Sequence, residues 1–236
     1  MGQWLKRLSY LALVGFPLAV LGTRLELFDF RTAFAGITYT VYLAVALVFL
    51  GLVLFFMQRK SNPDSAKAAR WATIISLIPL LGIGTQLVTA RSVPEIHNIS
   101  TDVVDPPAFN KISEIRSSTD NPLEYDQEKL AAVQQKAYPG VKTLVSSLSK
   151  AEAHERAIVV SQALGWEVVS DDSFNGIVEA TETTTLWGFK DDVVIRIRDH
   201  ESGGTAVDLR SVSRVGRSDL GANAKRIERF LQAFNQ

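Results

Sequence analysis

The sequence predicts an α+β protein, with three transmembrane helices followed by an antiparallel four-stranded sheet that carries two helices on one face. Three long uncharged runs in the first 93 residues predict the spans. Four segments of alternating apolar and polar residues, flanked by two amphipathic segments, predict the sheet and its helices. We therefore expect a membrane domain (1–93), an extended linker that wraps the soluble domain (94–140) and an extracytoplasmic α+β domain (141–236).

Each of the three apolar runs is bounded by charged residues. The runs comprise 16 residues after Arg7, 27 after Arg31 and 20 from Trp71 to Ala90. A spanning helix needs about 20 residues at about 1.5 Å each, so only the first run is short. A cleaved signal peptide is the alternative for that run, but no small-x-small cleavage site follows it. No charge interrupts any run, which disfavours a proton or transport path.

Basic residues near the spans predict the orientation of the chain. Six lie on the side of the N-terminus and the second loop: Lys6, Arg7, Arg59, Lys60, Lys67 and Arg70. Three lie on the other side: Arg24, Arg31 and Arg91. Because Lys and Arg concentrate in cytoplasmic loops, we expect a cytoplasmic N-terminus and a soluble domain across the membrane, in a periplasm-like space.

The turn between the first two spans, TRLELFDFRTAF, mixes aromatic residues with charges of both signs. One interpretation is a solvated loop at the depth of the lipid headgroups, with its aromatic side chains directed into the membrane. The other makes Glu26 and Asp29 a cation or proton site at the membrane surface. The sequence leaves both open.

Composition restricts the classes of partner and chemistry. Residues 1–93 carry 9 Lys/Arg and 3 Asp/Glu, a net charge of +6, while residues 94–236 carry 16 and 22, a net charge of −6. The absence of a basic domain argues against nucleic acid as a partner. The chain has no cysteine, which excludes disulfides, thiol nucleophiles and cysteine-ligated zinc.

Five prolines distinguish the linker, at positions 94, 106, 107, 122 and 139. Each restricts the residue before it to extended geometry, so a long helix is excluded there. A short helix from Leu123 to Lys136 remains possible.

The pattern becomes regular after Gly140. A first amphipathic helix is expected from Val145 to Leu164, closed by Gly165. Four strands are expected to follow, at Trp166–Ser170, Gly176–Thr184, Asp192–Asp199 and Thr205–Arg214. A last helix, Leu220–Phe234, begins at a Ser218 or Asp219 cap. The short connections favour an antiparallel meander.

Several stretches carry a family resemblance: IHNISTDVVDPPAF, YPGVKTL, GWEVV, ATETTTLWGFKDDVVIRI and DLRSVSRVGRSDLGANAKRI. Together they resemble the domain-of-unknown-function family 1499, in members with three membrane helices ahead of the soluble domain. The resemblance covers roughly residues 95–234. It implies a bacterial or plastid envelope protein, and it transfers no catalytic residues.

A charged face of the predicted sheet is the first candidate site. Paired as a meander, the strands would gather seven polar side chains on the face away from the helices: Glu179, Thr181, Thr183, Arg196, Arg198, Asp208 and Arg210. Exposed cross-strand charge pairs contribute only about 0.2–1 kcal/mol each. The set therefore describes either a solvated face or a docking surface for another envelope protein or for this protein's own membrane helices.

A second candidate is an anion site at the start of the last helix, formed by Arg214, Arg217 and Ser218. Free backbone N–H groups at a helix start attract phosphate or a lipid headgroup. The alternative is simpler, because Ser218 or Asp219 could cap the helix and occupy its positive end.

Enzyme motifs are missing from the sequence. It contains no G-x-S-x-G, P-loop or dinucleotide motif, and its three histidines show no metal-ligand spacing. Acidic residues bracket the third strand, at Asp191-Asp192 and at Asp199-His200-Glu201, and could converge on a cation. Trp187-Gly188-Phe189 is an aromatic turn that either closes one end of the core or, if exposed, contacts a ligand or the membrane. We expect no cofactor and no metal.

These observations favour a non-enzymatic protein of the bacterial cytoplasmic membrane. It would act through contacts of its periplasmic domain, as an accessory or assembly subunit of a membrane complex, with the lipid bilayer and another envelope protein as partners. A lipid- or anion-binding module is the alternative, and a hydrolase comes third. The sequence leaves the partner, the ligand and the oligomeric state open.

Overall fold

The computed structural model describes residues 1–236, which form two compact units. The first comprises residues 1–89 together with Leu186–Gly188. The second comprises residues 90–185 and 189–236.

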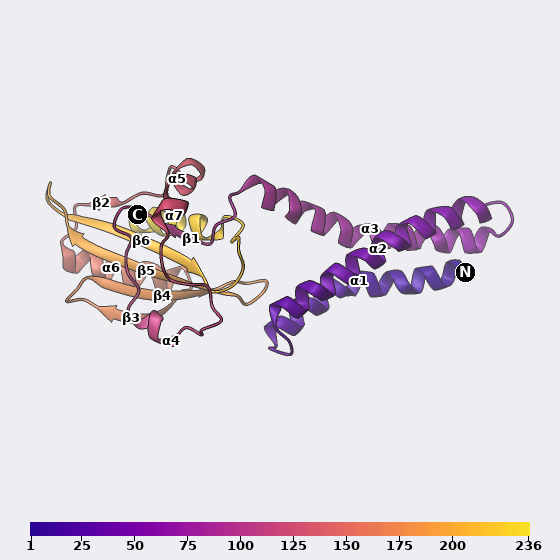
Figure 1. Cartoon of the computed structure of the whole chain (residues 1–236), viewed down its shortest axis with the longest axis horizontal. Helices are drawn as coiled ribbons and strands as arrows, with labels where there is room; N and C mark the ends of the chain where they lie inside the picture. The colour runs from indigo at the N-terminus through magenta and orange to yellow at the C-terminus, as the bar shows by residue number, and fades with distance from the viewer. The chain divides into compact units, whose positions relative to one another are not determined.

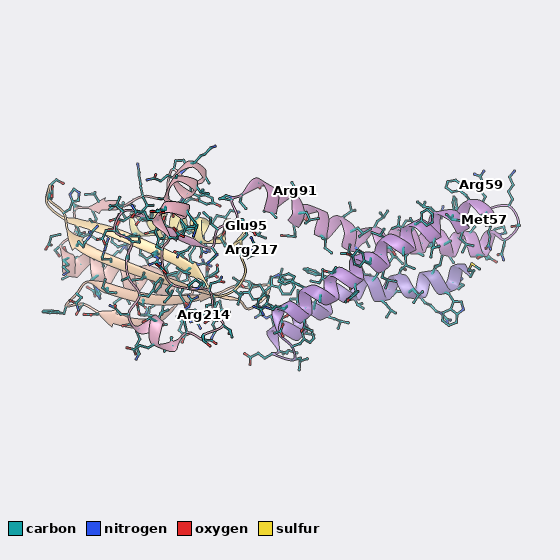
Figure 2. All side chains as sticks on the ribbon, in the orientation of Figure 1. Met57, Arg59, Arg91, Glu95, Arg214 and Arg217 are labelled. Atoms are coloured by element: carbon teal, nitrogen blue, oxygen red, sulfur yellow. The ribbon has the colours of Figure 1, made fainter.

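Three helices make up most of the first unit: α1 (Gly2–Arg24), α2 (Phe30–Gln58) and α3 (Pro63–Ser92). All three are long and apolar enough to cross a membrane. They extend beyond the apolar runs into the charged flanks, so that Met57 and Arg59 lie at the end of α2 (Figures 1 and 2). Asp29 caps α2, accepting a 2.9 Å hydrogen bond from the backbone N–H of Thr32.

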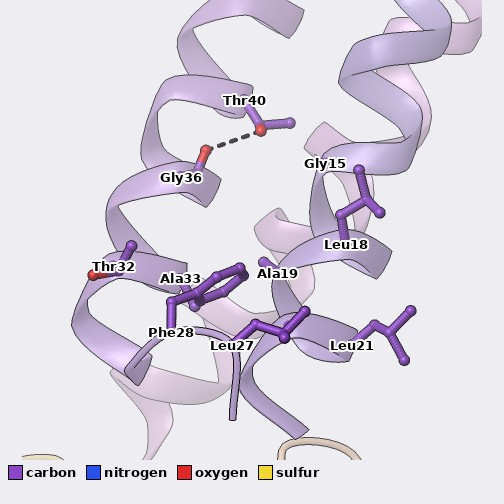
Figure 3. A pocket seen from close by; sticks show the side chains of 11 residues that line it. Gly15, Leu18, Ala19, Leu21, Leu27, Phe28, Thr32, Ala33, Gly36 and Thr40 are labelled. Carbon is purple, nitrogen blue, oxygen red and sulfur yellow. Dashed lines mark hydrogen bonds between the residues drawn. The ribbon is translucent and has the colours of Figure 1, made fainter. Parts of the chain in front are cut away.

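Small residues allow α1 and α2 to approach each other closely. A Cβ added at Gly15 would lie 2.4 Å from the Thr40 hydroxyl oxygen, so only glycine fits there. Towards the loop that joins the two helices, they leave an apolar groove of about 520 Å³, with Leu27 and Phe28 of the loop on its wall (Figure 3). The C-terminal half of α3 is largely exposed within this unit, including Leu81 and Val88.

Aromatic rings gather in the first unit around Trp187. The centroid of its ring lies 5.7 Å from that of Phe16, edge-on, and 5.2 Å from that of Phe34. Ala19, Ala33 and other apolar side chains of α1 and α2 complete this cluster.

The second unit contains a six-stranded antiparallel sheet rather than the four-stranded sheet expected from the sequence. Its strands are β1 (Asn98–Ser100), β2 (Leu144–Ser146), β3 (Glu167–Asp172), β4 (Ile177–Thr183), β5 (Lys190–Asp199) and β6 (Thr205–Ser213). The order is β1-β6-β5-β4-β3, and β2 also pairs with β6. The four expected strands are β3 to β6, each within two residues of its expected bounds at either end. The two additional strands have three residues each, too few for an alternating pattern to identify them.

The helices of this unit are α4 (Lys111–Ile115), α5 (Gln127–Ala137), α6 (Lys150–Ala163) and α7 (Ala222–Phe234). The expectation of a helix from Val145 was wrong at its start, because Val145 lies in β2 and pairs with Ala206. A capping box sets the observed start, with Ser149 and Glu152 each bonded to the other's backbone N–H.

The main core lies between α6, α7 and one face of the sheet. Trp166 and Phe230 stack at its centre, with ring centroids 5.5 Å apart. The other principal side chains are Ala153, Ala157 and Val160 of α6, Ile227 and Phe234 of α7, and Val193, Ile195, Ile197, Val207 and Leu209 of the sheet. Arg156 of α6 donates to the last carbonyls of α7, which joins the two helices.

The opposite face of the sheet is covered by the chain itself. Residues 101–126, which include α4, form a third layer with a small apolar cluster of Phe109, Ile112, Val194 and Val212. α5 protects the edge of β1, where the Gln134 side-chain amide bonds to both backbone groups of Ser100. The proline-rich linker therefore contributes a strand, two helices and the cover of one sheet face.

Candidate functional site

The seven candidate docking residues lie on the sheet face beneath residues 101–126. Glu179, Thr181, Asp208 and Arg210 are buried, and Arg196 and Arg198 are partly buried. Only Thr183 is exposed. Most of this face is therefore not open to a partner, because the linker folds back over it.

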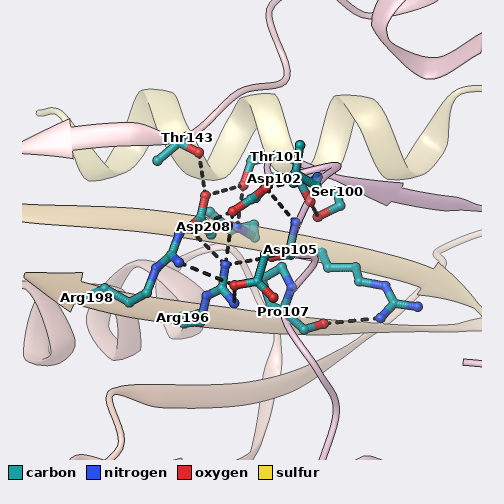
Figure 4. A network of polar contacts seen from close by, with 12 residues as sticks. Ser100, Thr101, Asp102, Asp105, Pro107, Thr143, Arg196, Arg198 and Asp208 are labelled. Atoms are coloured by element: carbon teal, nitrogen blue, oxygen red, sulfur yellow. Dashed lines mark hydrogen bonds and ion pairs between the residues drawn. The ribbon is translucent and has the colours of Figure 1, made fainter. Parts of the chain in front are cut away.

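Asp208 is the centre of a polar network on this face (Figure 4). Its buried carboxylate accepts hydrogen bonds from the hydroxyls of Thr101, at 3.1 Å, and Thr143, at 2.6 Å. It also accepts from Arg198 at 2.7 Å and from Arg196 at 3.4 Å. Four donors thus converge on one carboxylate, which compensates for the cost of burying its charge.

Two carboxylates from the covering segment, residues 101–126, complete this network on its outer side. Asp105 accepts from Arg196 at 2.9 Å, and Asp102 accepts from both arginines at 3.2 Å. Burial tends to raise the pKa of Asp102, but hydrogen bonds from the backbone N–H groups of Asp105 and Val104 and the two arginines outweigh it and lower the pKa. The network therefore attaches the loop to the sheet by charge-assisted bonds.

Arg210 bonds the covering segment, residues 101–126, at two points and β1 at a third. Its guanidinium donates to the side-chain oxygen of Asn98 at 3.0 Å and to the carbonyls of Pro107, at 3.2 Å, and Leu123. The guanidinium carbon also lies 5.5 Å from the ring centroid of Phe109 and 5.6 Å from that of Tyr125.

The surroundings of Arg210 contain no carboxylate that bonds to it. Burial lowers the pKa of Arg210 to about 10 and raises the pKa of Tyr125 to about 12. Both groups therefore keep their usual protonation states at neutral pH, and Arg210 stays a cation held by neutral oxygens and aromatic rings.

Glu179 and Thr181 bond to other elements as well. Glu179 accepts from the backbone N–H groups of Asn110 and, at 2.9 Å, Ile112 at the start of α4. The hydroxyl of Thr181 donates to Asp192 at 2.8 Å. Neither side chain is available to a partner.

Asp192 forms a second charged cluster on this face. It accepts from Arg116 at 2.9 Å and from Arg214 through two bonds, at 2.8 and 2.9 Å. Asp191, its neighbour along β5, points to the other face and bonds Arg226 of α7. The two carboxylates therefore do not converge on a cation, and no group of three His, Asp or Glu side chains in the chain is arranged to hold a metal ion.

The anion-site residues are separated rather than gathered. Arg214 is committed to Asp192, whereas Arg217 is exposed and forms a 3.1 Å ion pair with Glu95 (Figure 2). The Ser218 hydroxyl accepts from the backbone N–H of Leu220 at 3.3 Å.

α7 begins at Ala222 with Gly221 as its N-cap, rather than at Leu220 after a Ser218 or Asp219 cap as expected, but the Asp219 side chain still bonds backbone N–H groups at its start. The Asp219 carboxylate accepts from the backbone N–H groups of Gly221, at 2.8 Å, and Asn223, at 2.9 Å. Burial raises the pKa of Asp219, although these two bonds favour its charged form. An anion at this helix start would have to displace this carboxylate.

A shallow depression of about 590 Å³ lies at the other end of the sheet, between α6 and the β3–β4 turn. Lys150, His154 and Glu155 of α6 line one side, and Asp171 and Phe174 line the other. His154 and Asp171 bond across it at 2.6 Å. Phe174 projects from the turn with 89% of its surface exposed, the largest value among the exposed large hydrophobic residues of the chain.

Residues 98–234, which form most of the second unit, match one sequence family. The model of a family described as "Protein of unknown function (DUF1499)" matches these residues, more than half of the chain. The chain belongs to the DUF1499 family. A search of curated proteins returns no match.

The DUF1499 match covers every strand, from β1 to β6, and all of helices α4 to α7. It therefore includes the covering loop and both charged clusters. Since the DUF1499 family has no described function, membership assigns no role to Asp192, Asp208 or Arg210.

The sequence predicted which strand residues share this face of the sheet. It did not predict which residues of the covering segment bond to them. Asp102 and Asp105 bond Arg196 across 94 and 91 residues of chain, and Arg116 bonds Asp192 across 76. No local pattern reports contacts over such distances. The only available signal was the excess of polar residues in a linker that lacks a helical or strand period.

Proposed function

We propose that this DUF1499 protein is anchored in a bacterial cytoplasmic membrane by its three helices and presents its α+β domain in the periplasm. The distribution of basic residues supports this topology, with six on the N-terminal side of the spans and three on the other. A reporter fused after Gln236 tests it. We expect alkaline phosphatase to be active and green fluorescent protein to be dark, and the reverse result would contradict the topology.

The domain acts by docking another envelope protein, without catalysis, as an accessory or assembly subunit. The observation that carries this proposal is the exposure of Phe174, 89% of whose surface is in solvent. Exposed aromatic side chains beside a depression are typical anchors of protein interfaces, where a few such residues supply most of the binding energy.

The β3–β4 turn holds Phe174 in a defined place. Asp172 accepts from the backbone N–H of Asn175 at 3.1 Å and from its side-chain amide at 2.7 Å. The Lys150 ammonium donates to the carbonyl of Phe174 at 3.4 Å, which connects the turn to α6. A turn whose backbone is ordered in advance loses less conformational entropy on binding.

The surface around Phe174 carries both charge signs, since Lys150, Glu155 and Asp171 line the depression. Such a mixture suits a partner with a polar rim and an apolar centre. The anion-binding alternative has less support, because Asp192 and Asp219 already occupy the groups that would bind the anion.

Native purification of wild type, Phe174→Ala and Val104→Ala from membranes tests the docking role. Val104 is the matched control, an apolar side chain with 76% of its surface exposed that lines no part of the depression. We expect a stoichiometric protein partner with wild type and Val104→Ala, and its loss with Phe174→Ala. A partner set unchanged by Phe174→Ala would contradict the proposal, and a retained lipid in place of a protein would favour the alternative.

A further inference from the structure

The loop between β4 and β5, residues 184–189, carries the apolar side chains of Leu186, Trp187 and Phe189. Thr184 and Phe189 close the loop, with one 2.8 Å backbone hydrogen bond and a 2.9 Å bond to the Thr184 hydroxyl. None of its residues belongs to either apolar cluster of the sheet. Leu186 at the tip is 53% exposed. The aromatic turn therefore does not close the core of the domain.

Strand register places this loop at the end of the sheet where the chain enters the domain. Asn98, the first residue of β1, pairs with Val212, which pairs in turn with Asp192 near the start of β5. Two strand spacings, about 10 Å, therefore separate the entry point from the base of the loop.

The entry point is connected to a candidate membrane span by a short segment. α3 ends at Ser92 and β1 begins at Asn98, so five residues join them. A fully extended chain of that length reaches only about 20 Å. The length of the connection thus keeps this end of the sheet close to the bilayer surface.

The chemistry of the loop suits that surface. Trp and Leu side chains favour the boundary between headgroups and acyl chains, and basic residues beside them attract lipid phosphate. Lys190 follows the loop and is exposed, and the exposed Arg217 belongs to the same end of the sheet.

We propose that residues 184–189 are an interfacial anchor, with Leu186 inserted among lipid headgroups and upper acyl chains. This goes beyond docking, since it gives the domain a second attachment to the bilayer besides α3. β4, with its seven residues, separates this loop from the β3–β4 turn by about 23 Å, so Phe174 remains in water.

The natural absence of cysteine makes the test direct. Leu186→Cys and Phe174→Cys each place one thiol at an exposed tip, at opposite ends of β4. Each full-length variant is labelled with an environment-sensitive fluorophore and inserted into phosphatidylcholine–phosphatidylglycerol nanodiscs. Quenching is then compared between lipids that carry a nitroxide near the headgroup and aqueous iodide.

We expect the label at 186 to be quenched severalfold more by the lipid nitroxide than by iodide, with a blue-shifted emission. The label at 174 should show the opposite preference. Iodide quenching at 186 equal to that at 174 would overturn the proposal. Shielding of the 186 label from both quenchers would also overturn it, because protein rather than lipid would then surround the tip. Neither outcome bears on Phe174 docking, which the purification experiment tests separately.

Discussion

The two faces of the sheet are covered in physically different ways. On one face, α6 and α7 bury mainly aliphatic and aromatic side chains such as Ile195 and Phe230, together with one buried ion pair between Arg226 and Asp191. On the other, an irregular segment is held by Asp208, Arg210 and Asp192, each of them bonded to several partners. The first face is held mainly by buried apolar area, whereas the second is held mainly by buried charges that each bond to a partner.

Truncation in the apolar layer should have the largest effect. Phe230→Ala removes a fully buried ring that stacks on Trp166 and contacts Phe234, and should cost about 3–5 kcal/mol of domain stability. Hydrogen exchange of the full-length protein in nanodiscs should show faster exchange in all strands together. Phe174→Ala is the matched control, because its ring is exposed and its removal should leave exchange unchanged. Faster exchange in α7 alone would contradict a single cooperative core.

Loss of the Arg210 guanidinium on the other face should have a smaller and more local effect on stability. Arg210→Met keeps most of the side-chain length but removes the donors to Asn98, Pro107 and Leu123, at a cost of about 3 kcal/mol. Hydrogen exchange should increase first in residues 101–126, which the guanidinium holds, with β5 still protected.

Arg198→Met provides the comparison within the same face. This side chain is partly exposed, and Asp208 keeps its bonds to Thr101, Thr143 and Arg196, so we expect a cost of about 1 kcal/mol or less. Equal effects of Arg198→Met and Arg210→Met would show that the cover is not held at discrete points.

The smallest effect concerns a charge on the helix-covered side. Burial raises the pKa of Asp219 above its ordinary value of 3.8, so the folded state binds this proton more tightly than the unfolded state. Its contribution to stability is therefore complete below pH 3.8 and is lost as the pH rises through the folded pKa. Asp219→Asn keeps a capping side chain but removes this dependence. Melting temperatures of the full-length protein above pH 3.8 should fall more for wild type than for Asp219→Asn, and parallel curves would contradict the burial argument.

The same contrast between the faces explains what could be predicted from the sequence. Alternation of apolar and polar residues located β3 to β6, and a 3.6-residue apolar period located α7, because one side of each element faces the apolar layer. The cover of the other face has no such period. Asp102, Asp105 and Arg116 sit in irregular chain, and their bonds to the sheet depend on geometry that only the folded chain shows.

The candidate site was predictable to the same extent. Glu179, Asp208 and Arg210 could be assigned to one face from the period of two, but their burial could not. A strand pattern shows which side chains share a face and not what lies above it. The exposed Phe174 was missed for a related reason, since a single aromatic residue in a turn has the same pattern whether it is buried or not.

The pairing of β1 with β6 has a consequence for biosynthesis. Asn98 and Arg210 are bonded across 112 residues, and α7 follows still later, so the domain cannot close until its chain is almost fully synthesised. A truncated chain that ends before Ala222 would expose the part of the apolar sheet face that α7 normally covers. Release of such a fragment should lead to aggregation or proteolysis, so folding of the domain depends on the synthesis of α7.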